Sequence, residues 1–175
     1  MIRQKKLAAL VILSCLLQSC TFSAPQVEVA FRNAQSLLFN KASGDEVLWL
    51  ASYNDTGAVL RPYVAGGYTV FANESGDAIA FDGWVVRSVL GFGLEQALTI
   101  SDDGLVRSSR LGEESFVAHC SQWQKDTTNM GFQWRQICGR YGHMTVIYID
   151  EAGSIRRIDQ TFGGDLGTLR LHLRR

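Results

Sequence analysis

From residue 46 to residue 173 the chain repeats one pattern, in which short runs of alternating apolar and polar residues are separated by turn residues. Such alternation places successive side chains on opposite faces of a strand. The runs are rich in Val, Ile, Thr and aromatic residues, which favour pleated and half-buried surfaces. The pattern predicts an antiparallel all-β domain of about ten to twelve short strands, either a sandwich or a partly closed barrel.

The turns locate the strands. We expect strands at residues 46–53, 58–64, 68–72, 78–81, 84–90, 97–100, 105–111, 114–119, 132–138, 141–149, 154–162 and 168–173. The segment 114–119 is expected to face 132–138 across a polar stretch. The acidic pairs Asp102-Asp103 and Glu113-Glu114 fall in turns and are interpreted as solvated.

One segment departs from the period of two. Apolar residues recur at helical spacing in residues 26–40, which predicts an amphipathic helix: Val27, Ala30, Phe31, Ala34, Leu37 and Leu38. Its polar face holds only Arg32 and Lys41 as cations. Packing on the β core is therefore favoured over lying on a membrane surface. We expect residues 27–175 to form a single β-rich periplasmic domain.

Residues 1–19 have the composition of a secretory signal, with Arg3, Lys5 and Lys6 ahead of an apolar run at 7–17. The run is too short to span a bilayer, which takes roughly 20 apolar residues. The tetrad Leu17-Gln18-Ser19-Cys20 fits a bacterial lipobox. It predicts cleavage before Cys20, acyl chains on Cys20 that hold the protein at a membrane, and a tether over residues 20–26.

Cleavage at this position changes the charge. It leaves 156 residues with 14 basic and 17 acidic side chains, a net charge near −3. Such a chain lacks the basic patch that nucleic acid requires, so no nucleic-acid partner is expected. It also lacks a polybasic segment for anionic lipids, so the anchor on Cys20 must supply membrane attachment.

Two further cysteines, Cys120 and Cys138, remain in the exported chain. An oxidising periplasm favours a disulfide between them. Free thiols and metal ligation are the alternatives, but no Cys-x-x-Cys motif supports a metal site.

The rest of the chain shows no catalytic set. His119, His143 and His172 lack metal-ligand spacing, and His172 alternates with leucines so that it should face solvent. Nucleophile elbows and phosphate loops are absent from the sequence. We therefore expect no enzymatic activity and no cofactor. Trp49 and Trp134 fit a core, whereas Trp84 follows a turn and is either exposed or buried.

Two segments resemble the YjbF/GfcB-type lipoprotein family. Residues 83–92, Gly-Trp-Val-Val-Arg-Ser-Val-Leu-Gly-Phe, resemble its Gly-Arg-Val-Val-Arg-Thr-x-Gly-Leu segment. Toward the C-terminus, Cys138, residues 148–155 and residues 159–163 resemble its cysteine, aromatic strand, Asp-x-x-Gly turn and Ser-x-Gln-like segment. Trp84 stands where the family has a basic residue, and Ser88 replaces its Thr.

The resemblance implies a β-rich periplasmic lipoprotein that assists production or export of exopolysaccharide or capsule. The resemblance carries over only Cys20, as the lipid site; Trp84 and Arg87 are a candidate surface, read from the residues themselves, for a glycan or for a partner in the export machinery. Thr21 after Cys20, in place of the Asp that retains lipoproteins in the inner membrane, predicts an outer-membrane anchor facing the periplasm. A lipid- or lipoprotein-handling half-barrel and a glycan-acting enzyme are the alternatives.

Overall fold

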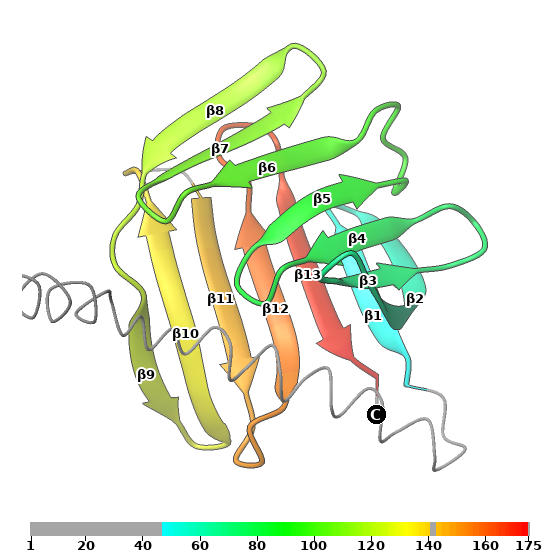
Figure 1. Cartoon of the computed structure of the whole chain (residues 1–175). Helices are drawn as coiled ribbons and strands as arrows, with labels where there is room; N and C mark the ends of the chain where they lie inside the picture. Colours follow the sequence, from blue (N-terminus) through cyan, green and yellow to red (C-terminus); the bar gives the residue numbers. More distant parts are fainter. Residues whose placement is uncertain (1–46, 141–142, 175) are drawn as a thin grey trace, which may run out of the picture.

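The computed structural model describes residues 47–140 and 143–174, and these residues form thirteen antiparallel strands without a helix among them (Figure 1). The predicted signal at 1–19, Cys20, its tether and the helix at 26–40 lie outside the described residues. The strands are β1 (Trp49–Tyr53), β2 (Thr56–Ala65), β3 (Tyr68–Ala72), β4 (Ala78–Phe81), β5 (Val86–Leu90), β6 (Leu98–Asp102), β7 (Val106–Leu111), β8 (Glu114–His119), β9 (Gln124–Thr128), β10 (Gly131–Cys138), β11 (His143–Ile149), β12 (Ile155–Thr161) and β13 (Thr168–Leu173).

The strands form one sheet in the order β8-β7-β6-β5-β4-β3-β2-β1-β13-β12-β11-β10-β9. Each strand pairs with its neighbour along the chain, except that β8 and β9 are not paired and that β1 pairs with β13. The sheet therefore curls into an all-β antiparallel half-barrel that is open between β8 and β9. The expected all-β class is confirmed, and of the two expected architectures the half-barrel corresponds to the partly closed barrel.

The half-barrel has two leaves, which meet at β2. The first five residues of β2 pair with β1, and its last five pair with β3. The C-terminal leaf contains β1 and β9–β13, and the N-terminal leaf contains β3–β8. Figure 1 shows β10–β13 running steeply across β4–β8. The hairpin after β2 turns at Gly66 and Gly67, whose φ angles of 57° and 83° suit the turn that matches strand twist.

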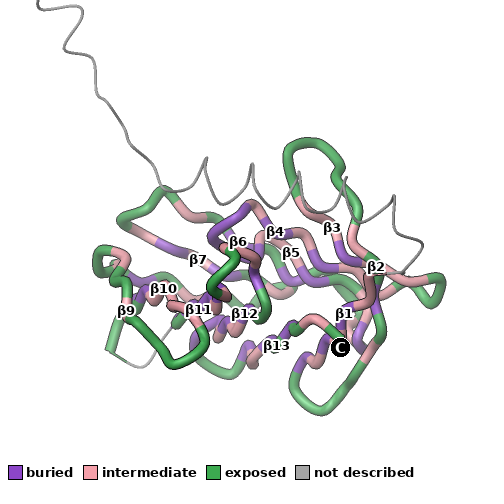
Figure 2. Tube along the Cα trace, turned by 90° about the horizontal axis from the view of Figure 1, so that it is seen from below, coloured by how far each residue is buried: buried purple, intermediate pink, exposed green. Residues whose placement is uncertain are grey.

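The core lies between the leaves, and Figure 2 shows buried segments on strands of both. On β13, for example, Leu169 and Leu171 are fully buried while Arg170 and His172 between and beyond them are exposed. The ring of Trp49 on β1 meets that of Phe71 on β3 with centroids 5.0 Å apart. Strand alternation thus supplies an apolar inner face and a polar outer face to the C-terminal leaf.

The strand count exceeds the expected ten to twelve because the polar stretch Gln124–Thr128 forms β9 and pairs with β10. The expectation that 114–119 faces 132–138 is wrong. Strand β8 pairs with β7, and β9 occupies the edge of β10. Among the described residues, the ladder contact between the ends of β8 and β10 is the isolated bridge at Cys120 and Cys138. Inserting β9 separates two segments that a simple hairpin would have joined.

Candidate functional site

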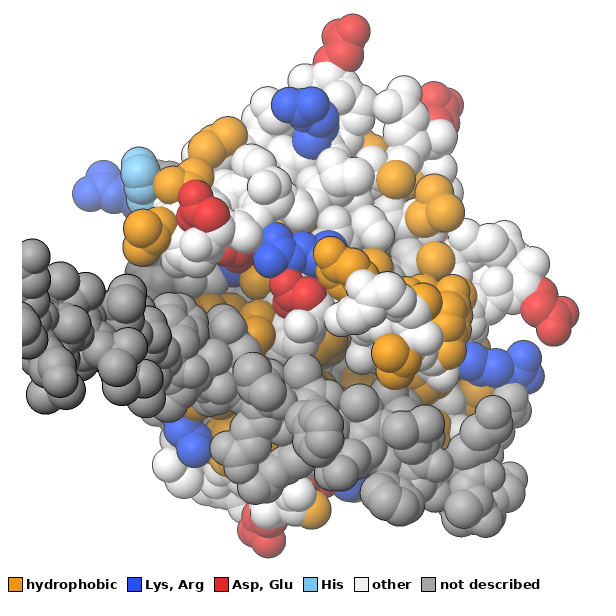
Figure 3. Space-filling model, viewed as in Figure 1, with side chains coloured by type: hydrophobic (Ala, Val, Ile, Leu, Met, Phe, Trp, Pro, Cys, Tyr) orange, Lys and Arg blue, Asp and Glu red, His pale blue; other side chains and the backbone are white. Residues whose placement is uncertain are grey.

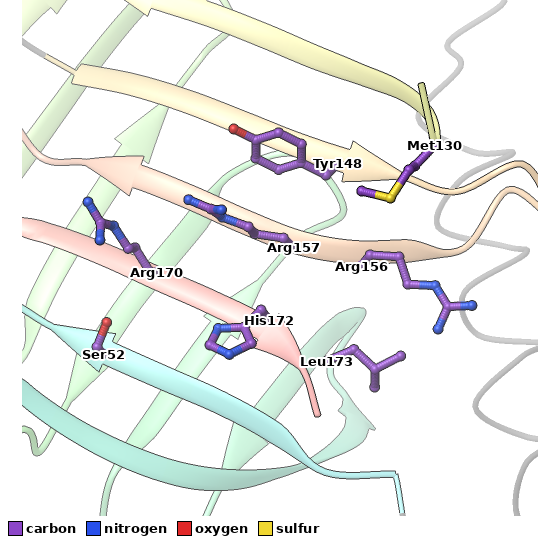
Figure 4. A pocket seen from close by; sticks show the side chains of 8 residues that line it. All are labelled: Ser52, Met130, Tyr148, Arg156, Arg157, Arg170, His172 and Leu173. Carbon is purple, nitrogen blue, oxygen red and sulfur yellow. The ribbon is translucent and has the colours of Figure 1, made fainter. Parts of the chain in front are cut away.

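A groove of about 590 Å³ crosses the outer face of the C-terminal leaf, the face turned away from the N-terminal leaf (Figure 4). We call it the arginine groove. Strands β1, β11, β12 and β13 and the turn before β10 contribute its lining residues, which are Ser52, Met130, Tyr148, Arg156, Arg157, Arg170, His172 and Leu173.

Strand register brings these side chains together. His172 on β13 pairs with Arg157 on β12, and Arg157 pairs in turn with Tyr148 on β11. Arg170, two residues before His172 on β13, pairs with Ser52 on β1. Because alternate residues of a strand point to the same face, all of these side chains lie on the outer surface. His172 is exposed, as the sequence predicted.

Carboxylates neutralise two of the three guanidinium groups. Arg157 makes an ion pair with Asp159 at 2.6 Å, and the hydrogen bond from this guanidinium raises the pKa of Arg157. The guanidinium also lies 5.1 Å from the centroid of the Tyr148 ring, where a cation–π contact holds it. At the other end, Arg156 pairs with Asp150 at 2.5 Å.

Arg170 differs from the other two arginines. It is exposed, and within the described residues no carboxylate lies within ion-pair distance of it. Figure 4 shows the side chains of Arg157 and Arg170 extending in the same direction along the sheet, whereas Arg156 points to the opposite end. Arg157 and Arg170 therefore present guanidinium groups at one end of the groove. This geometry suits binding of anionic groups, because guanidinium forks match carboxylate and phosphate oxygens.

Sequence alternation alone could have identified part of this site. Arg170 and His172 alternate with buried leucines, which places them outward. The neighbouring strands that bring Arg157 and Tyr148 beside them are set by the sheet order, which the sequence did not reveal. On the face of the molecule seen in Figure 3, by contrast, acidic and basic side chains are interspersed.

Trp84 does not contribute to the surface that we expected at Trp84 and Arg87, because its side chain is buried. Trp84 is only 7% exposed, and its ring packs edge-on against those of Trp123 and Trp134, with centroids 4.7 and 5.5 Å away. The carboxylate of Asp82 accepts hydrogen bonds from the backbone N–H groups of Trp84 and Val85, both at 2.8 Å. This bend turns the indole into the protein, so the interpretation of Trp84 as a surface residue is wrong.

Arg87 lies partly exposed on β5, in the N-terminal leaf. Its Nε donates to Asp82 at 2.5 Å, and its Nη1 donates to the backbone carbonyl of Asp102 at 3.2 Å. The guanidinium thus joins the turn after β4 to the end of β6. Arg87 is not among the residues that line the arginine groove.

A second polar cluster is buried between the leaves. Arg107 on β7 is fully buried and pairs with Asp102 at 2.6 Å. Burial lowers the pKa of Arg107, and the Asp102 carboxylate opposes that shift. Arg107 also donates to Thr145 on β11 at 2.7 Å and to Gln136 on β10. The expectation that Asp102 is solvated is wrong, because its side chain is only 5% exposed and faces this guanidinium.

His143 belongs to the same interior. Its Nδ1 lies 3.1 Å from the hydroxyl oxygen of Ser109, and its ring meets that of Phe116 with centroids 5.1 Å apart. Burial, followed by the nearby positive charge of Arg107, lowers the pKa of His143 to about 4. Both His143 and Ser109 are fully buried, so this pair has no access to a substrate. The cluster joins the leaves and supplies no reactive surface.

The predicted disulfide between Cys120 and Cys138 is present, with the sulfur atoms 2.04 Å apart. It joins the end of β8 to the end of β10, on either side of the opening of the half-barrel. Within the described residues, three or more His, Cys, Asp or Glu side chains nowhere gather into a set that could hold a metal ion. No helix in the described part of the chain has the length and apolar character to cross a membrane.

Fold and groove together define an all-β half-barrel with a cationic groove on its outer face. The sequence matches no protein-family model and no curated protein. Among solved structures, the fold is similar to that of the hypothetical lipoprotein YmcC from Escherichia coli K12. The TM-score is 0.53 at 10% sequence identity, and the match covers 90% of this chain and 98% of that one. At this identity the likeness shows a shared fold.

Proposed function

We propose that this chain is a lipid-anchored accessory protein of the outer membrane that assists production or export of exopolysaccharide or capsule. It acts on the periplasmic side by binding a glycan or a partner protein in the arginine groove. The observation that carries the proposal is the collection of three guanidinium groups, an imidazole and a tyrosine on one face of the sheet. The lipobox at Cys20 and the fold shared with a lipoprotein support the anchor.

The groove has the chemistry of a binding site. Guanidinium groups recognise anions by charge and by paired hydrogen bonds and are poor proton-transfer groups. The titratable carboxylates beside it, Asp150 and Asp159, are both engaged by arginines. Hydrogen bonds from the backbone of Ser154 and from Arg156 outweigh partial burial and lower the pKa of Asp150. A paired carboxylate with a lowered pKa, such as that of Asp150, is a poor general acid.

A lipid-handling half-barrel would require a large apolar cavity under the helix predicted at 26–40, a segment outside the described residues, or in the space between the leaves. The described side chains pack there into a continuous cluster that includes Leu60, Ile79, Leu98, Ile158 and Leu171, each fully buried. Among the described residues, this filled space supports the accessory function over lipid carriage between the leaves.

Gene deletion tests the proposal. Loss of the gene should reduce surface polysaccharide under inducing conditions, measured as polymer per cell. The wild-type gene should restore the polymer, and a Cys20→Ala variant should not, because it removes the anchor. Polymer levels that stay unchanged on deletion would refute the function in polysaccharide production.

A further inference from the structure

We infer that the arginine groove binds a segment of acidic polysaccharide, and that Arg170 and Arg157 recognise its carboxylate or phosphate groups. The inference rests on the proposed function and specifies the ligand of the same groove. Four features support it: the guanidinium of Arg170 without an ion-pair partner among the described residues, the hydrogen-bonding groups around it, the apolar end of the groove, and the carboxylate of Asp159, which lowers the affinity for anions.

Arg170 provides the strongest anion contact. Its guanidinium is exposed, has no ion-pair partner within the described chain, and extends toward the same end of the groove as that of Arg157 (Figure 4). Contact with Tyr148 restricts Arg157 and reduces the entropy that its side chain would lose on binding. An anionic group that enters here meets two guanidinium groups, one of which is already oriented.

Groups that exchange hydrogen bonds surround the two cations. The hydroxyl groups of Ser52 and Tyr148 and the imidazole of His172 can exchange hydrogen bonds with sugar hydroxyls. Met130 and Leu173 line the end of the groove near Arg156, where they can pack against the C–H face of a sugar ring. Charge, hydroxyl groups and an apolar wall match an acidic sugar better than an acidic peptide. The volume of about 590 Å³ lies within the range of roughly 300–1,000 Å³ that is usual for ligand pockets.

An anionic membrane surface fits the site less well. The cations line a hollow in the sheet and do not form a projecting patch, and the chain after cleavage at Cys20 has a net charge near −3. Electrostatic attraction to a bilayer requires clustered basic residues without such compensation.

Replacing Asp159 should change anion binding in the opposite direction to replacing either arginine. Asp159 pairs with Arg157 through both Nε and Nη2, and it is the register partner of Arg170 on the adjacent strand. Its carboxylate therefore weakens the field that an incoming anion meets. Replacing it by Asn releases Arg157 and should strengthen anion binding, whereas removing either arginine should weaken it.

The test measures binding of the full-length lipidated chain, purified in detergent, to polygalacturonate oligosaccharides at low salt. Arg170→Gln should weaken binding about tenfold, which corresponds to about 1.4 kcal/mol. The double variant Arg157→Gln/Arg170→Gln should abolish binding, and Asp159→Asn should strengthen it. Arg110→Gln, which removes an exposed arginine of the N-terminal leaf, is the matched control and should bind like the wild type. Urea unfolding verifies that every variant is folded.

Three further probes identify the source of the anion. The methyl-esterified oligosaccharides lack the charge and should not bind, while polyglutamate and phosphatidylglycerol vesicles should bind more weakly than polygalacturonate. Equal binding of polyglutamate or of the vesicles would overturn the inference, as would equal losses in Arg110→Gln and Arg170→Gln, or no polygalacturonate binding at all. These outcomes leave the effect of gene deletion on polymer levels as a separate measurement.

Discussion

The side-chain amide of Gln160 on β12 binds both backbone polar groups of Val86 on β5. Its Oε1 accepts from the Val86 N–H at 2.9 Å, and its Nε2 donates to the Val86 carbonyl at 3.1 Å. Gln160 is fully buried and stands 74 residues from Val86. A side chain of one leaf thus substitutes for a neighbouring strand of the other leaf, and fixes how the two leaves face each other.

Gln160→Leu should therefore destabilise the protein by about 2–5 kcal/mol, because it leaves the N–H and C=O of Val86 buried without partners. Urea unfolding monitored by circular dichroism measures the loss. Gln133→Leu, at an outward position on β10, is the control and should change stability by less than about 0.5 kcal/mol. Similar unfolding free energies for the two variants would contradict the described function of Gln160.

Asp102→Ala should cost about 3–5 kcal/mol, since it leaves the fully buried guanidinium of Arg107 without its counter-charge. Asp126→Ala removes a carboxylate of the same size from an exposed pair, in which Arg135 lies 3.7 Å away. That pair should contribute no more than about 1 kcal/mol. If Asp102→Ala lowers the free energy of unfolding no more than Asp126→Ala does, our interpretation of the buried Arg107–Asp102 pair is wrong.

His143 should make stability fall on acidification. Its pKa is about 4 in the folded protein and about 6.5 in an unfolded chain, so only the unfolded state binds a proton between these values. The free energy of unfolding should drop by about 3 kcal/mol from pH 6.5 to pH 4, beyond the contribution of other groups. His143→Asn, which retains a polar atom near Ser109, should remove this component, whereas His172→Asn should preserve it. Parallel pH profiles for wild type and His143→Asn would refute the assignment.

The disulfide should stabilise the protein by about 3 kcal/mol, because it closes a loop with a sequence separation of 18 residues. The double variant Cys120→Ser/Cys138→Ser should unfold at lower urea concentration than the wild type, and a reducing agent should lower the midpoint of the wild type alone. Mass analysis of the unreduced exported protein should show two hydrogens fewer than in the dithiol form. Two alkylatable thiols would show that the bridge does not form.

Trp84→Ala should destabilise the protein by about 3–5 kcal/mol, because it removes a buried indole from between Trp123 and Trp134. Tyr63→Ala, at a side chain that is 50% exposed, serves as the comparison and should have a small effect. Glycan binding by Trp84→Ala should match the wild type under conditions where both are folded. A stable variant with lost binding would restore the surface interpretation of Trp84.

Local sequence was sufficient for most of the strands. The predictions at 68–72, 78–81, 114–119 and 168–173 coincide with β3, β4, β8 and β13, because each run has an apolar face and is bounded by turn residues. Strand β9 lacked this signal. Its residues are all exposed or half-buried, so the sequence has no apolar face from which this strand could be predicted. Pairing with β10 holds the strand in the sheet.

The polar interior could not be predicted by the same reasoning. Arg107 and Ser109 occupy the inward positions of β7, yet a run of Val-Arg-Ser-Ser-Arg-Leu gives no apolar face that would identify them as buried. Their burial is tolerated only because Asp102, Gln136 and Thr145 satisfy the guanidinium. Two of these partners lie on strands of the other leaf. The arginine groove could not be predicted from the sequence for a related reason, because the order of the strands, and not spacing along the chain, brings its arginines together.

The pairing of β1 with β13 has a consequence for how the chain must acquire its structure. Trp49 is the register partner of Leu173, so β1 has a neighbouring strand on both sides only after β13 has been added. A chain that lacks β13 therefore has two unpaired edges besides those of β8 and β9, one on β1 and one on β12, next to strands that are already apolar on one face. Contacts this distant in sequence form slowly, and open edges promote association between chains. Completion of β13 is thus the event that ends the most vulnerable period of folding.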